Sequence, residues 1–268
     1  MTRVLTAAVG IPVVVAVTYV GGTLFAGVIA VAAIIAQLEL YDLQRKIGWN
    51  PSSVLGVILA LAVIIRYEIS WNESILIVIV LVILGDLLRT GPDRDPISRV
   101  AGTVMGVLYP VWLFSYFISI RLGLEASLSR VEAFALTMLL LILVWVADSS
   151  AYYVGKSFGK TPLAPTLSPK KTWEGSVAAI PGAIVAAVIF KLLWLPFLSW
   201  TDVVVLALIS GAWGQVGDLA ESALKRSAGV KDSGSILPGH GGMLDRLDSL
   251  IVVAPLYYLY LRFFMGIL

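Results

Sequence analysis

The apolar run TMLLLILVWVAD, Thr137 to Asp148, sets the class of this protein. It lies within a longer apolar segment, 133–154, which as a helix can cross the roughly 30 Å of hydrocarbon in a bilayer. The whole chain has the same character: 59% of its 268 residues are hydrophobic and 13% are charged, with a mean hydropathy of +0.94. A soluble domain carries about a quarter charged residues. The sequence therefore predicts an all-α, polytopic integral membrane protein, built as a helical bundle.

Hydropathy on both sides of this segment predicts about nine membrane-spanning helices. Their ranges are 4–20, 23–40, 53–66, 74–88, 101–121, 133–154, 176–195, 203–217 and 245–263. No internal repeat or separate soluble domain is visible. We therefore expect a single membrane domain, 1–268, with an N-terminal helical scaffold in 1–130 and the catalytic helices and cytoplasmic loops in 131–268. The chain has no cysteine, which excludes disulfides, thiolate catalysis and zinc–cysteine sites.

The distribution of basic residues predicts the orientation. An odd number of spans puts the two termini on opposite faces of the membrane. The face that holds the N-terminus carries 14 of the 19 basic residues: Arg3, Arg45, Lys46, Arg89, Arg94, Arg99, Lys156, Lys160, Lys170, Lys171, Lys225, Arg226, Lys231 and Arg246. By the positive-inside rule, the N-terminus is cytoplasmic and the C-terminus extracytoplasmic. The two longest polar segments, 155–175 and 218–248, are then cytoplasmic, and we expect the active site there.

The first polar segment follows the opening run. Asp148 lies about one turn inside the predicted end of its helix, where an ionisable residue usually faces a polar cavity or a charged partner. The alternative is a carboxylate that reaches the membrane interface. Lys170 and Lys171 directly precede a predicted helix start at 172–176, and both lysines and helix N-termini attract anions. These lysines could instead only fix the topology or contact anionic lipid headgroups.

The second polar segment carries acidic groups at both of its ends. Four polar residues at its start recur at three- and four-residue intervals and so share one helical face: Asp218, Glu221, Ser222 and Lys225. Asp245 and Asp248, three residues apart, lie on the first turn of the last helix. Between the two ends are basic residues and glycines that let a backbone approach a ligand closely: Lys225, Arg226, Lys231, Arg246, Gly234, Gly239, Gly241 and Gly242.

These residue types predict a metal–polyphosphate site. Carboxylates without histidine or cysteine partners suit Mg²⁺, which keeps some of its waters and accepts substrate phosphates. Lysine, arginine and backbone amides suit the phosphates. The alternative is a set of interfacial ion pairs that neutralise one another. His240 is the only histidine, which is weak evidence for zinc, and we expect it to contact a phosphate or a base.

The absence of familiar catalytic motifs narrows the reaction class. The sequence contains no HExxH, GxSxG or P-loop pattern, so a water or serine nucleophile would have no obvious base. A phosphate monoester is already ionised at neutral pH. Its attack on a metal-bound nucleotide requires mainly positioning and charge neutralisation.

The segment Ser222 to Asp248 resembles a known signature. Ser222-x-Leu224-Lys225-Arg226, followed after four residues by KDSGSILPGHGGMLDRLD, is similar over 27 residues to the motif of the phosphatidate cytidylyltransferases, or CDP-diacylglycerol synthases. The upstream stretches AYYVGKSFGK and SPKKTWEG also resemble a conserved block of that family. The resemblance extends over Asp148 to Ser249, and the first five predicted helices match only in general hydropathy.

The resemblance implies that CTP and phosphatidic acid react to CDP-diacylglycerol and pyrophosphate, with the lipid phosphate attacking the α-phosphorus of CTP in line. It implies Mg²⁺ and a second cation, held by Asp218, Asp245, Asp248 and Asp148. The implied catalytic residues are Asp218, Asp245, Lys225, Arg226, Lys231 and Arg246. The implied substrate-binding residues are Lys170, Lys171, Ser222, Gly239, His240, Gly241 and Gly242.

The expected partners are CTP, phosphatidic acid and the bilayer, with no nucleic acid, and the resemblance implies a homodimer. The expected location is a bacterial inner membrane, with the active site on the cytoplasmic side. A membrane transporter of a phosphorylated anion is the alternative function, because transporters also place charges, glycines and helix termini within the membrane. A transferase of CDP-linked headgroups is a weaker alternative, since its DG-x-x-AR spacing is not found.

Overall fold

The computed structural model describes residues 2–65, 74–90, 95–236, 239 and 241–268, and most of them are helical. The elements in chain order are α1 (Thr2–Val20), α2 (Gly22–Lys46), α3 (Ser53–Ile65), α4 (Ser74–Thr90), α5 (Pro96–Gly106), the π-helical segment η2 (Val107–Leu113), α6 (Phe114–Ser127), α7 (Arg130–Phe158), β1 (Pro162–Ala164), β2 (Ser168–Thr172), α8 (Trp173–Leu193), α9 (Trp200–Leu208), the π-helical segment η3 (Ile209–Trp213), α10 (Gly214–Ser227) and α11 (Leu244–Phe263).

Each predicted span falls on one helix or on one continuous helical run, with two exceptions. Residue 66 lies outside the described residues, and the span 176–195 extends two residues beyond the end of α8 at Leu193. Five runs in the described part of the chain are long and apolar enough to cross a membrane: Gly22–Lys46, Pro96–Ser127, Arg130–Phe158, Trp173–Leu193 and Trp200–Ser227. Helix α11 is of similar length, but it carries Asp245, Arg246 and Asp248 near its start. The predicted class, a helical integral membrane protein, is confirmed, whereas nine crossings and their orientation stay predictions.

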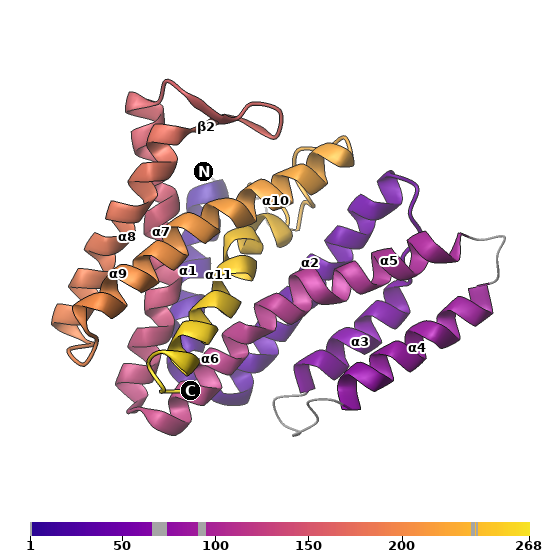
Figure 1. Ribbon diagram of the computed structural model, residues 1–268, viewed down its shortest axis with the longest axis horizontal. Helices are drawn as coiled ribbons and strands as arrows, with labels where there is room; N and C mark the ends of the chain where they lie inside the picture. Colours follow the sequence, from indigo (N-terminus) through magenta and orange to yellow (C-terminus); the bar gives the residue numbers. More distant parts are fainter. Residues whose placement is uncertain (1, 66–73, 91–94, 237–238, 240) are drawn as a thin grey trace.

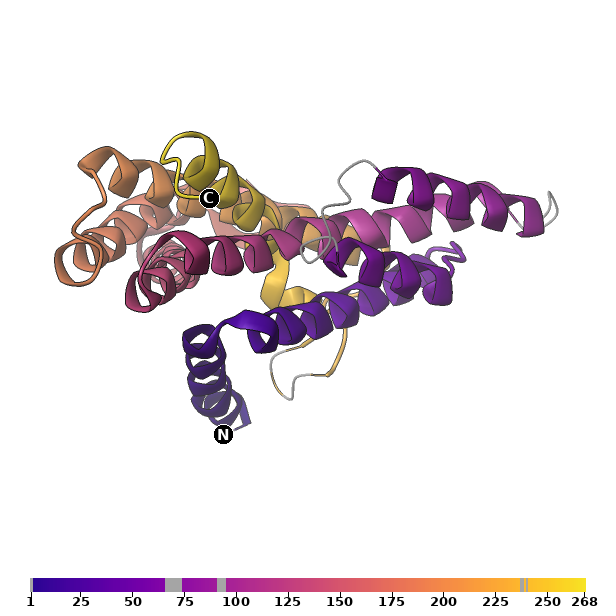
Figure 2. The same cartoon turned by 90° about the horizontal axis from the view of Figure 1, so that it is seen from below.

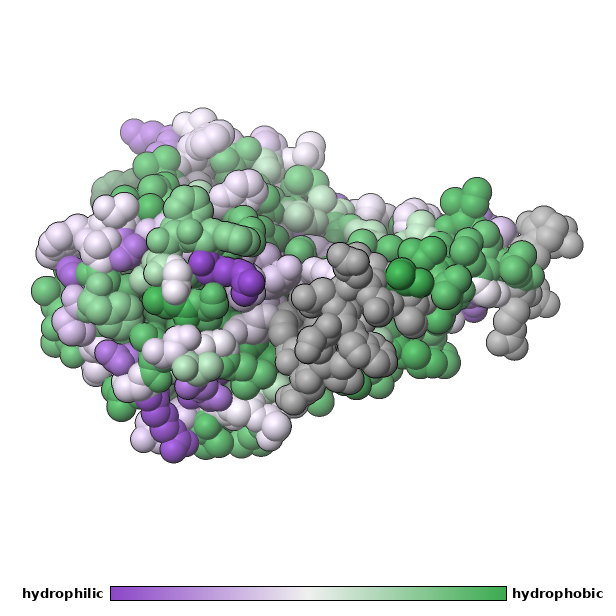
Figure 3. Space-filling view, turned by 60° about the horizontal axis from the view of Figure 1, so that its bottom comes forward, coloured by the Kyte–Doolittle hydropathy of each residue, from purple (hydrophilic) through white to green (hydrophobic). Residues whose placement is uncertain are grey.

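The helices form a bundle with an arm. Helices α6 to α11, together with α1, make the bundle, and α2 to α5 extend from it to one side (Figures 1 and 2). The arm exposes large apolar side chains, for example Val54, Ile58 and Leu81, and Figure 3 shows hydrophobic residues over much of its described surface. A surface of this kind suits lipid rather than water. The β hairpin, the start of α1 and the end of α10 lie toward one end of the molecule, and the C-terminus lies at the other (Figure 1).

Small residues let α7 and α8 pack closely. A Cβ atom at Gly175 would lie 2.5 Å from the Ala151 carbonyl oxygen, and one at Gly182 would lie 2.1 Å from the Ser150 hydroxyl. The predicted start of α8 is confirmed, because the Thr172 hydroxyl caps the helix by accepting a hydrogen bond from the Gly175 amide at 3.3 Å. This packing fixes the lysine-bearing strand β2 beside the end of α7.

Among the described residues, which are mostly helical, the antiparallel hairpin β1–β2 was not predicted. The strands contain three and five residues, with Ala164 opposite Ser168. Its sequence, PLAPTLSPKKT, holds three prolines and no regular alternation of apolar residues, so the usual strand signal is absent. The hairpin places Lys170 and Lys171 on β2.

Tyr41 on α2 holds the helices of the arm together. Its side chain is fully buried, and its hydroxyl donates a hydrogen bond to the Thr103 carbonyl oxygen at 2.9 Å. Two glycines leave room for the ring, since Cβ atoms at Gly56 and Gly106 would lie only 2.0 and 2.1 Å from Tyr41 atoms. Close packing around one aromatic residue therefore joins α2, α3 and α5 within the arm.

The change Gly106→Ala is expected to destabilise the protein. The new methyl group would overlap the Tyr41 ring, which is held by burial and by its hydrogen bond, and overpacking of this kind typically costs about 1–3 kcal/mol. Thermal unfolding in detergent measures the effect. Gly27→Ala is the matched control, because a Cβ at Gly27 on α2 meets nothing within 4 Å and is expected to be neutral or stabilising. Equal unfolding temperatures for the two variants would contradict the packing argument.

Candidate active site

A cavity of about 1040 Å³ lies where α7, α10 and α11 meet the first two helices. One part of its wall is apolar, with Ile11 and Val14 from α1, Ile29 from α2 and Phe117 from α6. The other part carries the charged residues Asp148, Lys170, Lys171, Asp218, Arg246 and Asp248. The cavity thus combines an apolar wall with a dense cluster of charged side chains. Such a wall suits a ligand that has both apolar and anionic parts.

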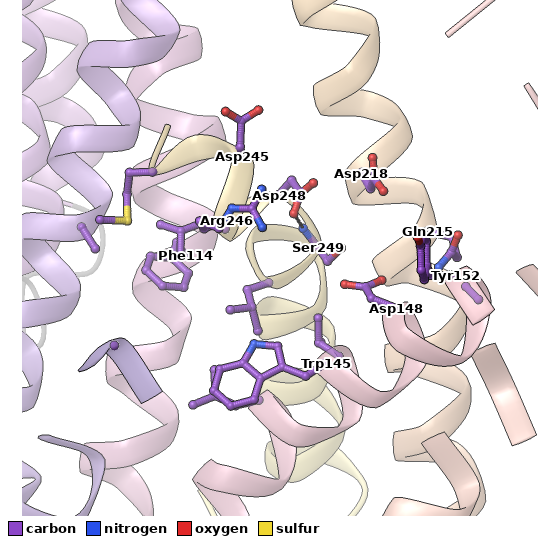
Figure 4. A pocket seen from close by; sticks show the side chains of 18 of the residues that line it. Phe114, Trp145, Asp148, Tyr152, Gln215, Asp218, Asp245, Arg246, Asp248 and Ser249 are labelled. Carbon is purple, nitrogen blue, oxygen red and sulfur yellow. Dashed lines mark hydrogen bonds between the residues drawn. The ribbon is translucent and has the colours of Figure 1, made fainter. Parts of the chain in front are cut away.

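Three aspartates from three helices face one another in this cavity (Figure 4). Asp148 comes from α7, Asp218 from α10 and Asp248 from α11. Oxygen atoms of Asp218, Asp248 and the fully buried Glu221 all lie within 4.8 Å of one another. Carboxylates at this separation repel each other unless a cation lies among or beside them. The set fits a hard divalent cation in its donor chemistry, since every donor is a carboxylate oxygen.

Glu221 was not among the predicted metal ligands. The sequence placed it on the same helical face as Asp218 and Lys225, and this spacing was the available signal. Burial distinguishes it from an ordinary surface glutamate, because its side chain is 0% exposed. Sequence spacing alone does not show which way a helical face turns.

Lys225 joins Glu221 to Asp245. Its ammonium lies 2.5 Å from Glu221 Oε2 and 2.6 Å from Asp245 Oδ1, and all three side chains are largely buried. The other Asp245 oxygen accepts hydrogen bonds from the backbone amides of Ser233 and Gly242 at 2.9 and 2.7 Å. Both oxygens of Asp245 therefore have protein partners, unlike an acidic group that simply faces the cavity.

The basic residues take different positions. Lys171 pairs with Asp218 at 2.6 Å, and Lys170 and Arg246 also line the cavity. Arg226 instead donates hydrogen bonds to the carbonyl oxygens of Leu167 at 3.3 Å and Val230 at 2.9 Å, which ties the end of α10 to the hairpin. In the described part of the chain, neither Arg226 nor Lys231 belongs to the cavity wall.

The remaining predicted substrate contacts lie in or near the loop between α10 and α11. The Ser222 hydroxyl donates to Asp218 Oδ1 at 3.3 Å, and His240 lies outside the described residues. Gly239 and Gly241 have positive φ angles of 76° and 81°, which explains glycine at both positions. A Cβ at Gly242 would lie 2.2 Å from the Ser233 hydroxyl and 2.4 Å from Glu39 Oε2, so the groups in close approach there are side chains of the protein.

Comparison with known proteins identifies the family. The model of the "Cytidylyltransferase family" matches residues 1–264. The chain belongs to this family. Curated relatives named phosphatidate cytidylyltransferase include those of Thermotoga maritima, 33% identical over 99% of this chain and 97% of the relative, and Synechocystis, 31% identical over 99% and 98%. The relative from Bacillus subtilis is 32% identical over 98% of this chain and 97% of its own length.

The membership confirms the predicted family and enzyme class. The cytidylyltransferase is a nucleotidyltransferase, and the match covers the first five predicted helices as well, where the motif resemblance did not reach. Its cavity wall brings together eight predicted site residues from distant segments, namely Asp148, Lys170, Lys171, Asp218, Lys225, Asp245, Arg246 and Asp248. The roles of the individual residues stay predictions.

Replacing Lys225 by methionine is expected to lower stability strongly. The change leaves Glu221 and Asp245 buried without their shared cation, and breaking a buried ion pair on one side typically costs about 3–5 kcal/mol. Adding Glu221→Gln should restore part of the loss, because it removes one uncompensated charge. Thermal unfolding of the two single variants and the double variant measures this coupling. Purely additive losses would show that Lys225 and Glu221 act independently.

Proposed function

We propose that this cytidylyltransferase transfers the cytidylyl group of CTP to phosphatidic acid, yielding CDP-diacylglycerol and pyrophosphate. The observation that carries the proposal is the composition of the single cavity described above, whose apolar wall adjoins its cationic and anionic groups. A diacyl lipid phosphate needs such a boundary between acyl chains and charge. The curated relatives named phosphatidate cytidylyltransferase over nearly full length support the same substrate pair.

The lipid would lie with its acyl chains along the apolar wall. Ile11, Val14, Ile29 and Phe117 offer surface of the right kind, and the lipid phosphate would then lie near Lys170 or Arg246. At neutral pH this phosphate is already an anionic nucleophile, so no residue needs to remove a proton from it. The work of the protein is to hold the phosphate oxygen in line with the α-phosphorus of CTP. The bond to this oxygen forms as the bond to pyrophosphate breaks.

Basic residues would neutralise the triphosphate. Lys170, Lys171 and Arg246 stand in the cavity wall, and Lys171 is already paired with Asp218, so it could move toward a phosphate group that replaces this partner. Arg226 and Lys231 are outside the described cavity wall but next in sequence to Lys225 and Asp232, which line it, so their charge would attract CTP rather than contact the reacting atoms. Ser222 and the glycines near His240 complete the proposed set.

The metal ligands that we propose are Asp218, Asp248, Asp148 and Asp245. Glu221 is added to them because one of its oxygens lies within 4.8 Å of oxygens of Asp218 and Asp248. When bound, Mg²⁺ neutralises phosphate charge and orients the triphosphate. A second cation would share the same carboxylates. At Asp245, a cation would compete with the Lys225 ammonium and with two backbone amides. Asp218 and Asp248 are therefore the first candidates for the primary site.

We propose that the charged end of the cavity faces the cytoplasm of a bacterial cell, across its inner membrane. The excess of basic residues on this side and the common location of hairpin, α10 end and α1 start support this orientation. CTP would arrive from the aqueous side, while phosphatidic acid would enter from the adjacent leaflet. Nine crossings and a homodimer belong to the same proposal.

The reaction is testable with the protein in nanodiscs that contain phosphatidic acid. Addition of CTP and Mg²⁺ should release pyrophosphate and CDP-diacylglycerol in equal amounts, and EDTA should stop the release. Omission of either substrate should also abolish it. In sealed vesicles, uptake of a phosphorylated anion without pyrophosphate release would instead support a transporter.

The change Asp248→Asn is expected to reduce kcat by about a hundredfold or more with little change in unfolding temperature. Loss of a group that only orients metal ligands already costs about 10–100-fold, and a direct ligand should cost at least as much. Asp245→Asn should lower both activity and unfolding temperature, because it weakens bonds to Lys225, Ser233 and Gly242.

Asp202→Asn is the matched control for both aspartate variants. Asp202 forms the capping box of α9 with Ser199 and accepts a hydrogen bond from the Tyr260 hydroxyl, but it is not part of the described cavity wall, so its change should affect stability only. Activity of Asp248→Asn within threefold of the unmodified enzyme would remove Asp248 from the proposed ligand set.

A further inference from the structure

Glu39, near the end of α2, connects the N-terminal helices to the loop between α10 and α11. Its side chain is buried, with 5% of the residue exposed. Oε1 accepts a hydrogen bond from the Met243 amide at 2.9 Å, and Oε2 accepts one from the Leu244 amide at 2.8 Å. The Ser233 hydroxyl lies 2.9 Å from Oε2. One carboxylate thus contacts Ser233 inside the loop as well as the residues where α11 begins, about 200 residues away in sequence.

These contacts supply the N-terminal cap of α11. The first amides of a helix have no partners within the helix, and a local serine, threonine or aspartate usually accepts from them. At α11 the N-cap residue is Met243, which provides no side-chain acceptor. Glu39, on α2, accepts these hydrogen bonds instead, and its negative charge also suits the positive end of the helix dipole.

The glycines of the loop fit around this carboxylate. A Cβ at Gly234 would lie 2.5 Å from Glu39 Oε1, and one at Gly242 would lie 2.4 Å from Oε2. A side chain at Gly234 would overlap Glu39, and one at Gly242 would overlap both the Ser233 hydroxyl, at 2.2 Å, and Glu39. The two glycines are therefore explained by contact with a side chain of this protein, without any ligand.

The capped turn carries the charged residues of the cavity. Asp245, Arg246 and Asp248 lie within the first five residues of α11, so the position of this turn sets where all three point. Asp245 continues the network, since its Oδ2 lies 3.0 Å from the Ser233 hydroxyl that also contacts Glu39. Glu39 itself is absent from the described cavity wall, so it can affect chemistry only through these neighbours.

We propose that Glu39 is a positioning residue of the cytidylyltransferase reaction, which fixes the first turn of α11 and the α10–α11 loop against α2. The expected effect of Glu39 on kcat rests on the proposed function. The tether itself does not depend on that function, because it consists of contacts within the protein. The carboxylate also fills the anion position at the start of α11, so substrate phosphates must bind to the side chains of the cavity rather than to these amides.

The first test is the change Glu39→Gln, which keeps the size of the side chain. The amide oxygen can still accept, but its NH₂ group cannot, so at least one of the donors at Met243, Leu244 and Ser233 loses its partner. We expect kcat to fall by about 10–100-fold while the KM for CTP changes by less than about threefold. Glu39→Asp retains both acceptors on a shorter stem and should recover part of kcat.

The second test needs no turnover. Lys231 lies exposed in the loop, so trypsin cleavage after Lys231 reports opening of this segment. In the absence of substrate, Glu39→Gln should increase the rate of this cleavage by about tenfold, because a hydrogen bond to a charged group is lost. Cleavage after Lys160, at the exposed start of the hairpin, should stay unchanged.

Glu132→Gln is the matched control. Glu132 belongs to the capping box of α7 with Ser129, so its loss weakens a helix cap without contact to the loop. This variant should change neither kcat nor cleavage after Lys231. A Glu39→Gln enzyme with unchanged loop cleavage and with kcat within twofold of the original would overturn the proposal. A lower unfolding temperature with normal kcat in the folded fraction would also overturn it, since it would show a purely structural role.

The two proposals fail in different ways. Absence of CDP-diacylglycerol formation by the unmodified protein would reject the proposed function, while faster loop cleavage in Glu39→Gln would still support the tether. Conversely, full activity together with unaltered cleavage in the variant would reject the role of Glu39 and leave the reaction in place.

Discussion

The shared ion pair of Lys225 with Glu221 and Asp245 is the interaction on which the charged cavity depends. Two carboxylates in so buried a place would be costly if they were unpaired, and a single ammonium within 2.6 Å of both offsets much of this cost. Because Lys225 and Glu221 lie on α10 and Asp245 lies on α11, the pair also joins these helices. Asp218 and Asp248 come close together next to this ion pair, and Asp218 has its own partner in Lys171.

The polar loop and its glycines show where sequence reasoning was incomplete. The spacing of Asp218, Glu221, Asp245 and Asp248 predicted two acidic faces that meet, and the structure brings oxygen atoms of Asp218, Glu221 and Asp248 together. The same reasoning treated the glycines only as places for a ligand. It could not find Glu39, because a contact between residues about 200 positions apart leaves no trace in local spacing. A lone glutamate near a helix end usually indicates an ordinary interfacial charge.

Hydropathy was sufficient for the helices because the bilayer imposes one dominant requirement. Backbone polar groups in hydrocarbon must be satisfied within the helix, so apolar runs predict helices reliably. The hairpin of Pro162–Ala164 and Ser168–Thr172 escaped prediction because it lies outside this constraint. Its position depends on close packing of α7 on α8 at Gly175 and on the bonds of Arg226, and neither is visible as a periodic pattern. The motif predicts a phosphate contact for Arg226, but it gives no sign of the hydrogen bonds that Arg226 donates to Leu167 and Val230.

The first two helices contribute to the cavity and not only to its support. The predicted division at residue 130 assigned a scaffold role to everything before it, yet Ile11, Val14 and Ile29 form part of the cavity wall. Glu39 lies ten residues, or almost three helical turns, beyond Ile29 on the same helix α2. Helix α2 therefore meets the cavity at one level and the start of α11 at another. A displacement of α2 would move the apolar wall and the cap of α11 together, which couples the proposed place for the acyl chains to the position of Asp245 and Asp248.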